Sequence, residues 1–93
     1  MNSELMTCPV CGYRPLFEDP WTGGSPSDEI CPCCGTQFGY DDAAGGDVER
    51  RREVYGELRR RWVAAGFPWS SRSRRPPDGW DPIAQMEAAG LSA

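Results

Sequence analysis

Four of the five cysteines lie in two matching C-x-x-C motifs, each followed by glycine. Residues 8–12 read Cys-Pro-Val-Cys-Gly, and residues 31–35 read Cys-Pro-Cys-Cys-Gly. Two such motifs bring four thiolates to one point, and four thiolates in a tetrahedron suit zinc or a single iron. The sequence therefore predicts a metal site with the ligands Cys8, Cys11, Cys31 and Cys34, zinc being the expected ion and iron the alternative.

The spacing and the flanking residues of these motifs have a physical reason. Two residues between the cysteines let the chain turn around a metal, so that backbone N–H groups can point at the sulfurs. The proline after the first cysteine fixes φ, and Gly12 and Gly35 can take the positive φ with which the chain leaves the turn. One C-x-x-C alone is also typical of thioredoxin-type redox sites, but two copies in register favour a metal site over redox chemistry or disulfides.

The fifth cysteine, Cys33, aligns with Val10, a spacer position of the first motif. We expect its side chain to point away from the metal and its thiol to be dispensable. The neighbouring thiolates should raise the pKa of Cys33 rather than activate it. A ligand set that uses Cys33 in place of Cys31 or Cys34 would leave a C-x-C or a C-C pair, which is less usual for a closed structural site.

Length and composition limit the classes of protein that the chain can belong to. Ninety-three residues make one small domain, and a structural zinc can add about 10–16 kcal/mol of apparent binding energy to such a small core. There is no apolar stretch that could cross a bilayer, and residues 1–6 lack the features of a signal peptide, so we expect no membrane association. Unpaired cysteines are typical of a reducing compartment, which predicts a cytoplasmic protein.

Charge is distributed unevenly along the chain. Residues 1–49 hold nine acidic side chains and one arginine, whereas residues 50–75 hold nine arginines and two glutamates. The arginine block could bind a polyanion or an acidic partner, but the low pI of about 4.7 favours docking onto the chain's own acidic half. The candidate partner surface comprises Arg59, Arg60, Arg61, Trp69, Arg72, Arg74, Arg75 and Trp80.

The first half of the chain has the pattern of strands around metal-binding turns. We expect strands at residues 4–7, 13–18 and 36–40, the last with Phe38 and Tyr40 on one face, and a loop containing Trp21 at residues 19–29. The predicted fold class is a small α+β protein: metal-stapled zinc-ribbon (rubredoxin-like) β-hairpins followed by one long and one short helix.

The second half of the chain predicts two helices. The first spans residues 48–65, with Asp47 as N-cap, Gly66 as stop, and an apolar stripe that packs on the ribbon. That stripe consists of Val48, Tyr55, Leu58 and Trp62, with Val54 beside it. The second helix begins with Asp81 as N-cap and Pro82 at its first position, ends near Ala89 before Gly90, and has Ile83 and Met86 as its apolar face.

These elements predict three segments of one compact domain. Residues 1–46 form the four-cysteine zinc ribbon, residues 47–66 form the arginine-rich helix, and residues 67–93 form an aromatic and arginine-rich tail with the short helix. We expect Trp62, Trp69 and Trp80 to tether this tail to the ribbon and the long helix.

Two resemblances follow from these motifs. Residues 8–13 (Cys-Pro-Val-Cys-Gly-Tyr), residues 29–34 (Glu-Ile-Cys-Pro-Cys-Cys) and the pair Asp41-Asp42 resemble the cysteine-rich CPCC-type small proteins of bacteria, although here the Cys-Pro-Cys-Cys run stands in the second motif. That resemblance implies a metal site and no particular activity. The same motifs are similar to the knuckles of rubredoxins, which hold one redox-active iron. However, 19 residues separate Cys11 from Cys31, fewer than in rubredoxins, and that fold has no place for the long helix.

Three classes of function remain. The expected class is a structural-zinc module that binds another macromolecule, a protein rather than a nucleic acid. The alternatives are a rubredoxin-like iron electron carrier and a nucleic-acid-binding zinc ribbon that uses the arginine-rich helix. We do not expect an enzyme, because the chain has no histidine and four cysteine ligands leave no open metal position.

Overall fold

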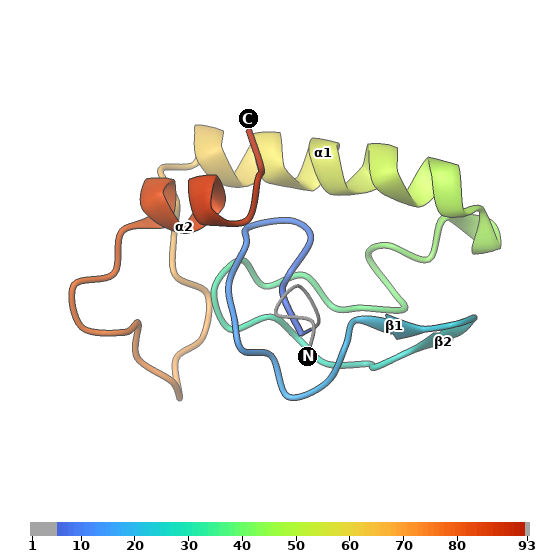
Figure 1. The fold of residues 1–93 in the computed structure, drawn as a ribbon, viewed down its shortest axis with the longest axis horizontal. Coiled ribbons are helices and arrows are strands. Elements are labelled where there is room, and N and C mark those ends of the chain that lie inside the picture. Colours follow the sequence, from blue (N-terminus) through green and yellow to red (C-terminus); the bar gives the residue numbers. More distant parts are fainter. Residues whose placement is uncertain (1–5, 93) are drawn as a thin grey trace.

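The computed structural model describes residues 6–92, and Figure 1 shows how its elements are arranged. In chain order these are the short strands β1 (Trp21–Thr22) and β2 (Ser25–Pro26), the 3-10 turn η1 (Ala44–Gly46), and the helices α1 (Val48–Ala64) and α2 (Pro82–Ala88). The long helix α1 runs along one side of the irregular N-terminal segment, and α2 lies near the C-terminal end of α1 (Figure 1). The chain is thus a small α+β protein.

The only regular sheet in the described residues is the β1–β2 hairpin, in which Trp21 pairs with Pro26 and Thr22 with Ser25. The sequence predicted a loop here, and that prediction is wrong. Gly23 and Gly24 form the turn, and Gly23 has the positive φ of +61° that tight hairpin turns require. Two residues per strand are marginal by themselves, so the hairpin depends on contacts outside it.

The strands predicted around the cysteine motifs do not form. Residues 13–18 and 36–40 contain no strand, and residues 6–7 of the predicted first strand are irregular, while its other residues lie outside the described part. Instead, isolated backbone contacts occur at these places: Leu16 N–H donates to Met6 O, and Ile30 pairs with Gln37 as a single bridge. Pro15 has no N–H to extend a ladder, and Phe38 is fully buried whereas Tyr40 is 71% exposed, so the two do not share a face.

Helix α1 begins and ends where its capping residues predict. The Asp47 carboxylate accepts hydrogen bonds from the N–H groups of Glu49 and Arg50, at 3.0 and 3.1 Å, and Gly66 leaves the helix with a φ of +92°. Trp62 is buried against the core, and Tyr55 and Leu58 pack beside it as expected. Val48 was expected on the same face but is 58% exposed, because the first turn of α1 extends beyond the core.

Helix α2 also has its predicted cap. Asp81 accepts hydrogen bonds from the N–H groups of Ile83 and Ala84, and Pro82 is the first helical residue. Met86 is buried, but Ile83 is 56% exposed, so only one of the two predicted apolar side chains packs inward. A helix of seven residues has only a narrow face that can pack on the core. In α2 that face is formed by Met86 and Gln85, the latter of which donates to the carbonyl of Cys11.

Aromatic side chains join the C-terminal segment to the rest of the molecule. Trp69 makes edge-to-face contacts with Tyr13 and Trp80, with ring centroids 5.5 and 5.2 Å apart, and Trp62 contacts Phe67 in the same way at 5.2 Å. These contacts confirm that the tryptophans tether the tail to the cysteine-rich segment and to α1. They enclose a core whose buried members are the following: Cys8, Val10, Cys11, Tyr13, Leu16, Cys31, Cys33, Phe38, Trp62 and Met86.

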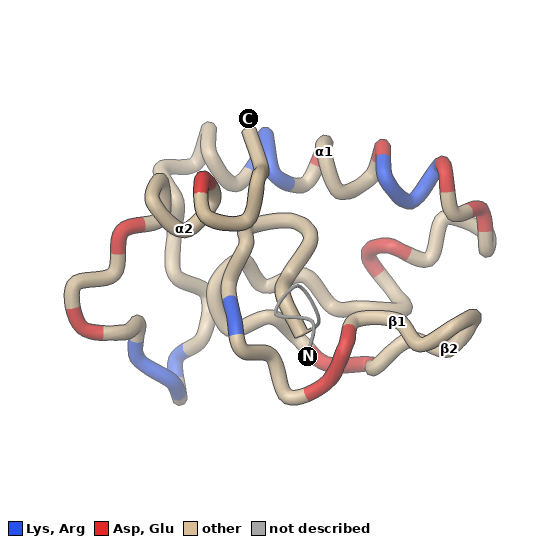
Figure 2. Tube along the Cα trace, viewed as in Figure 1, with Lys and Arg blue, Asp and Glu red and all other residues tan. Residues whose placement is uncertain are grey.

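Only part of the arginine block contacts the acidic half, through Arg51, Arg59 and Arg74, and these contacts differ from the predicted charge attraction. Figure 2 shows acidic residues around the loops near the hairpin and arginines along α1 and in the loop before α2. Within residues 6–92, the ion pairs join Arg50 to Glu53 and Glu57, all on α1, and none joins the arginine block to the acidic segment. Arginines contact that segment through carbonyl oxygens and aromatic rings instead.

No helix in the described residues is long and apolar enough to cross a membrane.

Candidate metal centre

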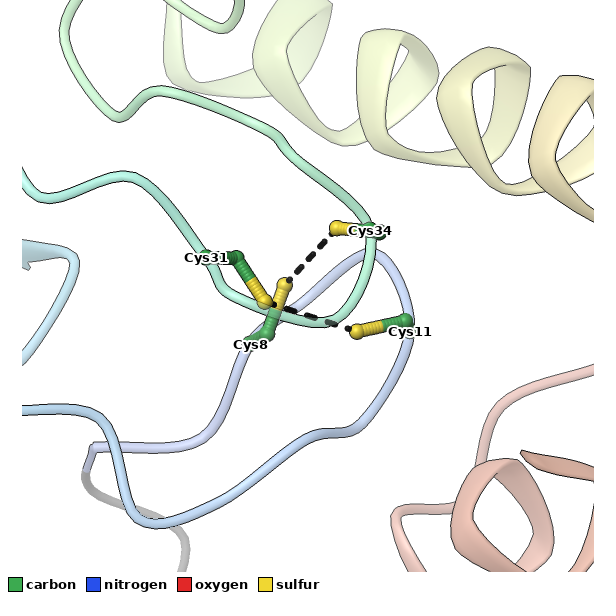
Figure 3. A group of neighbouring side chains, drawn as sticks. All are labelled: Cys8, Cys11, Cys31 and Cys34. Atoms are coloured by element: carbon green, nitrogen blue, oxygen red, sulfur yellow. Dashed lines mark hydrogen bonds between the residues drawn. The ribbon is translucent and has the colours of Figure 1, made fainter. Parts of the chain in front are cut away.

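The structure brings the four predicted cysteines to one point. All four Sγ atoms lie within 4.8 Å of one another, with 3.7 Å between Cys8 and Cys34 and 3.7 Å between Cys11 and Cys31. Figure 3 shows the thiols of two separate loops pointing toward one another. Cys8, Cys11 and Cys31 are fully buried and Cys34 is partly buried. Four convergent thiols of this kind are the donor set of a tetrahedral zinc or iron site.

The two cysteine motifs have the same backbone conformation. In each, the N–H of the glycine donates to the carbonyl of the first cysteine at 2.9 Å: Gly12 to Cys8 and Gly35 to Cys31. These glycines have φ values of +84° and +82°. The N–H of the first cysteine in turn donates to the residue after the glycine, Tyr13 or Thr36, at 2.9 Å. The register between the two motifs, inferred from Pro and Gly, is therefore confirmed.

Cys33 lies outside the group of four sulfurs, as its spacer position predicts. Its side chain is fully buried in the core, and the Gln85 side-chain amide lies 3.5 Å from its sulfur. The expected direction of its pKa shift is wrong: hydrogen bonding with Cys11 lowers the pKa of Cys33 against the effect of burial. Cys33 occupies the place of Val10, which is buried in the same way, so both spacers serve as core residues.

Burial and mutual hydrogen bonding shift the pKa values of three of the clustered cysteines in different directions. Burial raises the pKa of Cys8 well above its ordinary value, and hydrogen bonding with Cys31 raises the pKa of Cys11. Hydrogen bonds from Cys11, Cys31 and Cys8 lower the pKa of Cys34. The Thr36 hydroxyl lies 3.2 Å from Cys34 Sγ, where it can also donate to a thiolate. A metal ion must therefore displace protons from the buried thiols in order to bind.

Equivalent carbonyl groups of the two motifs receive hydrogen bonds from very different donors. In the first motif, Arg59 on α1 donates from Nε to Val10 O and from a terminal nitrogen to Pro9 O, both at 2.7 Å. In the second, the matching carbonyls of Cys33 and Pro32 accept from the backbone N–H groups of residues 70 and 71, at 2.9 and 2.8 Å. The segments that follow the cysteine-rich region thus satisfy the outward-facing carbonyls of both turns.

Helix α2 contacts the candidate centre through Gln85. Its side-chain N–H donates to the carbonyl of Cys11 at 2.9 Å, and its oxygen accepts from Trp80 Nε1 at 2.9 Å. Gly12 lies so close to this helix that an added Cβ would be 2.9 Å from Ala89 Cβ and from Gln85 O. The glycine therefore allows both the turn and the close approach of α2.

A buried carboxylate, Asp42, joins the hairpin, the segment after the second cysteine motif and α1. It is fully buried and accepts hydrogen bonds from Trp21 Nε1, Gly39 N and the Tyr55 hydroxyl, at 2.8, 2.7 and 2.8 Å. Burial, followed by the hydrogen bond to Asp42, raises the pKa of Tyr55. Sequence reasoning placed Asp42 in a loop, and no local signal separates it from its exposed neighbour Asp41.

Arg51 completes this buried polar cluster. Its Nε donates to the Asp42 carbonyl at 3.0 Å, and its guanidinium lies 3.6 Å from the centroid of the Trp21 ring. The side chain is 8% exposed. This contact fixes the β1–β2 hairpin to the first half of α1 through a cation–π interaction.

The structure divides the predicted partner surface into two groups. One group packs against other parts of the chain and comprises Arg59, Trp69, Arg74 and Trp80. Arg74, for example, donates to the Tyr13 hydroxyl, and its guanidinium lies 4.9 Å from the centroid of the Phe17 ring. The other members, Arg60, Arg61, Arg72 and Arg75, are exposed. The eight residues therefore do not form one continuous surface of free side chains.

The fold and the cysteine cluster define a small α+β protein with a site that could hold a metal ion. The chain is similar to two proteins of Bacillus subtilis (strain 168). It is 39% identical to the uncharacterized protein YoaQ over 44 residues, which are 45% of this chain and 37% of that protein. It is 36% identical to the uncharacterized protein YozI over 42 residues, 42% of this chain and 35% of that protein.

The matched part thus spans little more than a third of the length of these curated relatives. No family model matches the chain, and no solved structure matches it.

Proposed function

We propose that this chain is a structural-zinc module that binds another protein. The observation that carries the proposal is the convergence of four thiols, two from each cysteine motif, within 4.8 Å of one another. Zinc is the metal that most often takes four cysteines in a closed structural site. Four protein ligands complete the tetrahedron, so the site has no open position for a substrate, and we propose a binding role rather than a catalytic one.

The small regular structure supports a stabilising role for the metal. The cysteine-rich segment has one hairpin of two residues per strand, and the backbone pairing at Ile30 and Gln37 is a single bridge. Such a segment buries too little to order itself, whereas a four-thiolate zinc site contributes about 10–16 kcal/mol of apparent binding energy. The buried cysteines and their spacers Val10 and Cys33 then form the centre of the core.

A protein partner is supported by large apolar side chains that are exposed to solvent. Phe17 is 76% exposed, Ile30 56% and Tyr40 71%. Phe17 is tied to the residue before Ile30, because the carboxylate of Glu29 accepts hydrogen bonds from Phe17 N–H at 3.0 and 3.1 Å. Large exposed apolar residues with polar neighbours are typical of protein interfaces.

The metal and its ligands are tested by comparing two neighbouring cysteines. We expect Cys34→Ser to lose the bound metal and the folded structure, whereas Cys33→Ser should keep one metal ion per chain. Native mass spectrometry and elemental analysis measure the stoichiometry, and circular dichroism measures folding. The ligand assignment is wrong if the two variants behave alike, and a folded wild-type chain without metal would refute the proposal itself.

The same preparation distinguishes zinc from iron. Four thiolates also suit a single iron ion, as in the rubredoxin-like alternative. Protein purified from its native cell should be colourless and contain zinc. A red protein with a reversible one-electron couple would show that the centre is an electron carrier.

A further inference from the structure

We propose that Arg59 is a positioning residue of the metal centre and that it couples metal loading to the packing of helix α1. The inference rests on the proposed metal site and adds a regulatory link to it. Arg59 is one of nine arginines between residues 50 and 75, and its sequence context does not separate it from Arg60 and Arg61. Its contacts do.

The guanidinium of Arg59 makes a two-pronged contact with the first cysteine motif. Nε donates to Val10 O and a terminal nitrogen donates to Pro9 O, at 2.7 Å each. These carbonyls belong to the two spacer residues between Cys8 and Cys11. A planar guanidinium suits this geometry because its donors diverge at fixed angles, which a lysine ammonium cannot reproduce.

The second cysteine motif shows what this contact replaces. Its spacer carbonyls, those of Pro32 and Cys33, accept from two successive backbone N–H groups in the segment that covers them. The first motif has no such segment over it in the described residues, and one arginine side chain from α1 supplies both donors. Among the residues that the structure describes, these two carbonyls are therefore covered only by a side chain from another element.

This arrangement makes the metal and the helix depend on each other. Pro9 O and Val10 O face the same guanidinium only while Cys8 and Cys11 are held in the closed turn, and a bound metal holds them there. When the metal is released, the turn between Cys8 and Cys11 can change conformation. The guanidinium of Arg59 then loses its two acceptors, Val10 O and Pro9 O. By linkage, any contact of Arg59 that favours the loaded turn also raises metal affinity.

The link extends to the C-terminal end of the described chain. A terminal nitrogen of Arg59 donates to the carbonyl of Ser92 at 3.3 Å. The same guanidinium therefore joins the first cysteine motif, α1 and the segment after α2. Metal loading would thus order the two helices together, and with them the exposed arginines Arg60 and Arg61 on the last turns of α1.

The matched experiment compares Arg59→Gln with Arg60→Gln. The two variants change the net charge equally, but the side chain of Arg60 is exposed and makes no hydrogen bond or ion pair with residues 6–92. We expect Arg59→Gln to weaken zinc binding about 10–100-fold, as loss of outer-shell partners commonly does, and Arg60→Gln to leave it unchanged. Competition with a chromophoric chelator measures the affinity.

Two further readouts separate this role from a general loss of stability. The Co²⁺-substituted protein reports the ligand geometry in its absorption spectrum, which should change in Arg59→Gln and not in Arg60→Gln. Amide hydrogen exchange should show that zinc protects α1 strongly in the wild type and in Arg60→Gln, and less in Arg59→Gln. Arg59→Lys keeps the charge without the fork, so we expect an intermediate zinc affinity.

The outcomes distinguish this inference from the proposed function. A wild-type chain that folds without metal refutes the metal site itself. If the wild type binds zinc and Arg59→Gln matches Arg60→Gln in affinity, spectrum and exchange, the role of Arg59 is refuted while the metal site stands. If Arg59→Gln does not fold, Arg59→Lys decides: wild-type affinity and spectrum in that variant would refute the need for the fork.

Discussion

Individual residues of this chain have roles that depend on burial more than on residue type. Asp41 and Asp42 are adjacent carboxylates, yet Asp41 is exposed and accepts one hydrogen bond from Gln37 N–H, while Asp42 is fully buried and accepts three. A buried carboxylate is tolerated when donors surround it. Asp42 therefore supports the fold, whereas Asp41 closes a local turn.

We predict that Asp42→Asn destabilises the zinc-loaded protein by about 1–3 kcal/mol, because an amide leaves at least one buried donor without an acceptor. Asp41→Asn is the matched control and should cost less, since its site is exposed. Urea denaturation followed by tryptophan fluorescence measures both. Equal losses in the two variants would show that the buried cluster of Trp21, Asp42 and Tyr55 does not stabilise the fold.

The elements are positioned chiefly by their contacts with the two cysteine motifs. Helix α1 reaches the first motif through Arg59, and α2 reaches it through Gln85 and through close packing on Gly12. The segment of residues 70–71 covers the second motif. Each element after residue 47 thus provides donors that the turns themselves cannot provide.

The close approach of α2 to the first motif is tested by Gly12→Ala with Gly90→Ala as control. Both glycines have positive φ, +84° and +73°, so each substitution carries a backbone cost of about 1–2 kcal/mol. At Gly12 the new Cβ would also lie 2.9 Å from Ala89 Cβ and Gln85 O, whereas at Gly90 no heavy atom lies within 4 Å. We expect Gly12→Ala to be clearly more destabilising in thermal unfolding; similar shifts would mean that α2 is free to move away.

At the scale of the whole molecule, the proposed metal site predicts that metal binding and pH are coupled. A metal-loaded centre would hold fewer protons than the metal-free chain, because burial raises the pKa of Cys8 and hydrogen bonding raises that of Cys11. Acid therefore favours metal release, and stability gained from the metal is lost as the pH falls.

We predict that apparent zinc affinity rises with pH by at least about 100-fold per unit below the ordinary thiol pKa, because at least the protons of Cys8 and Cys11 must be displaced. Chelator competition at several pH values, with the chelator's own titration accounted for, measures this slope. An affinity that does not change with pH would show that the ligands are already thiolates without metal.

The charges of the whole chain predict weak binding to nucleic acids. The exposed arginines Arg60, Arg61, Arg72 and Arg75 belong to two separate segments, and the chain has a net charge of −4. We therefore expect no strong binding of labelled DNA or RNA at physiological salt. Micromolar or tighter binding that falls steeply between two salt concentrations would indicate phosphate contacts and would make the arginines the functional surface.

Features that depend on neighbouring residues could be predicted from the sequence. The cluster of four cysteines follows from spacing, and the starts of α1 and α2 follow from Asp47, Asp81 and Pro82, whose side chains act within one turn of the helix. The strands expected around the two cysteine motifs were wrong. The turns of these motifs and Pro15 allow only isolated backbone hydrogen bonds there, not a continuous β-ladder.

Which members of a run of similar residues are buried in the fold depends on long-range packing. It buried Asp42 rather than Asp41, and it placed Arg51 and Arg59 against carbonyl groups while Arg60 and Arg61 stayed exposed. Identical residues that are adjacent in the sequence have side chains of the same charge and length. What distinguishes them is which face of the helix meets an unsatisfied carbonyl, and that depends on residues distant in the chain.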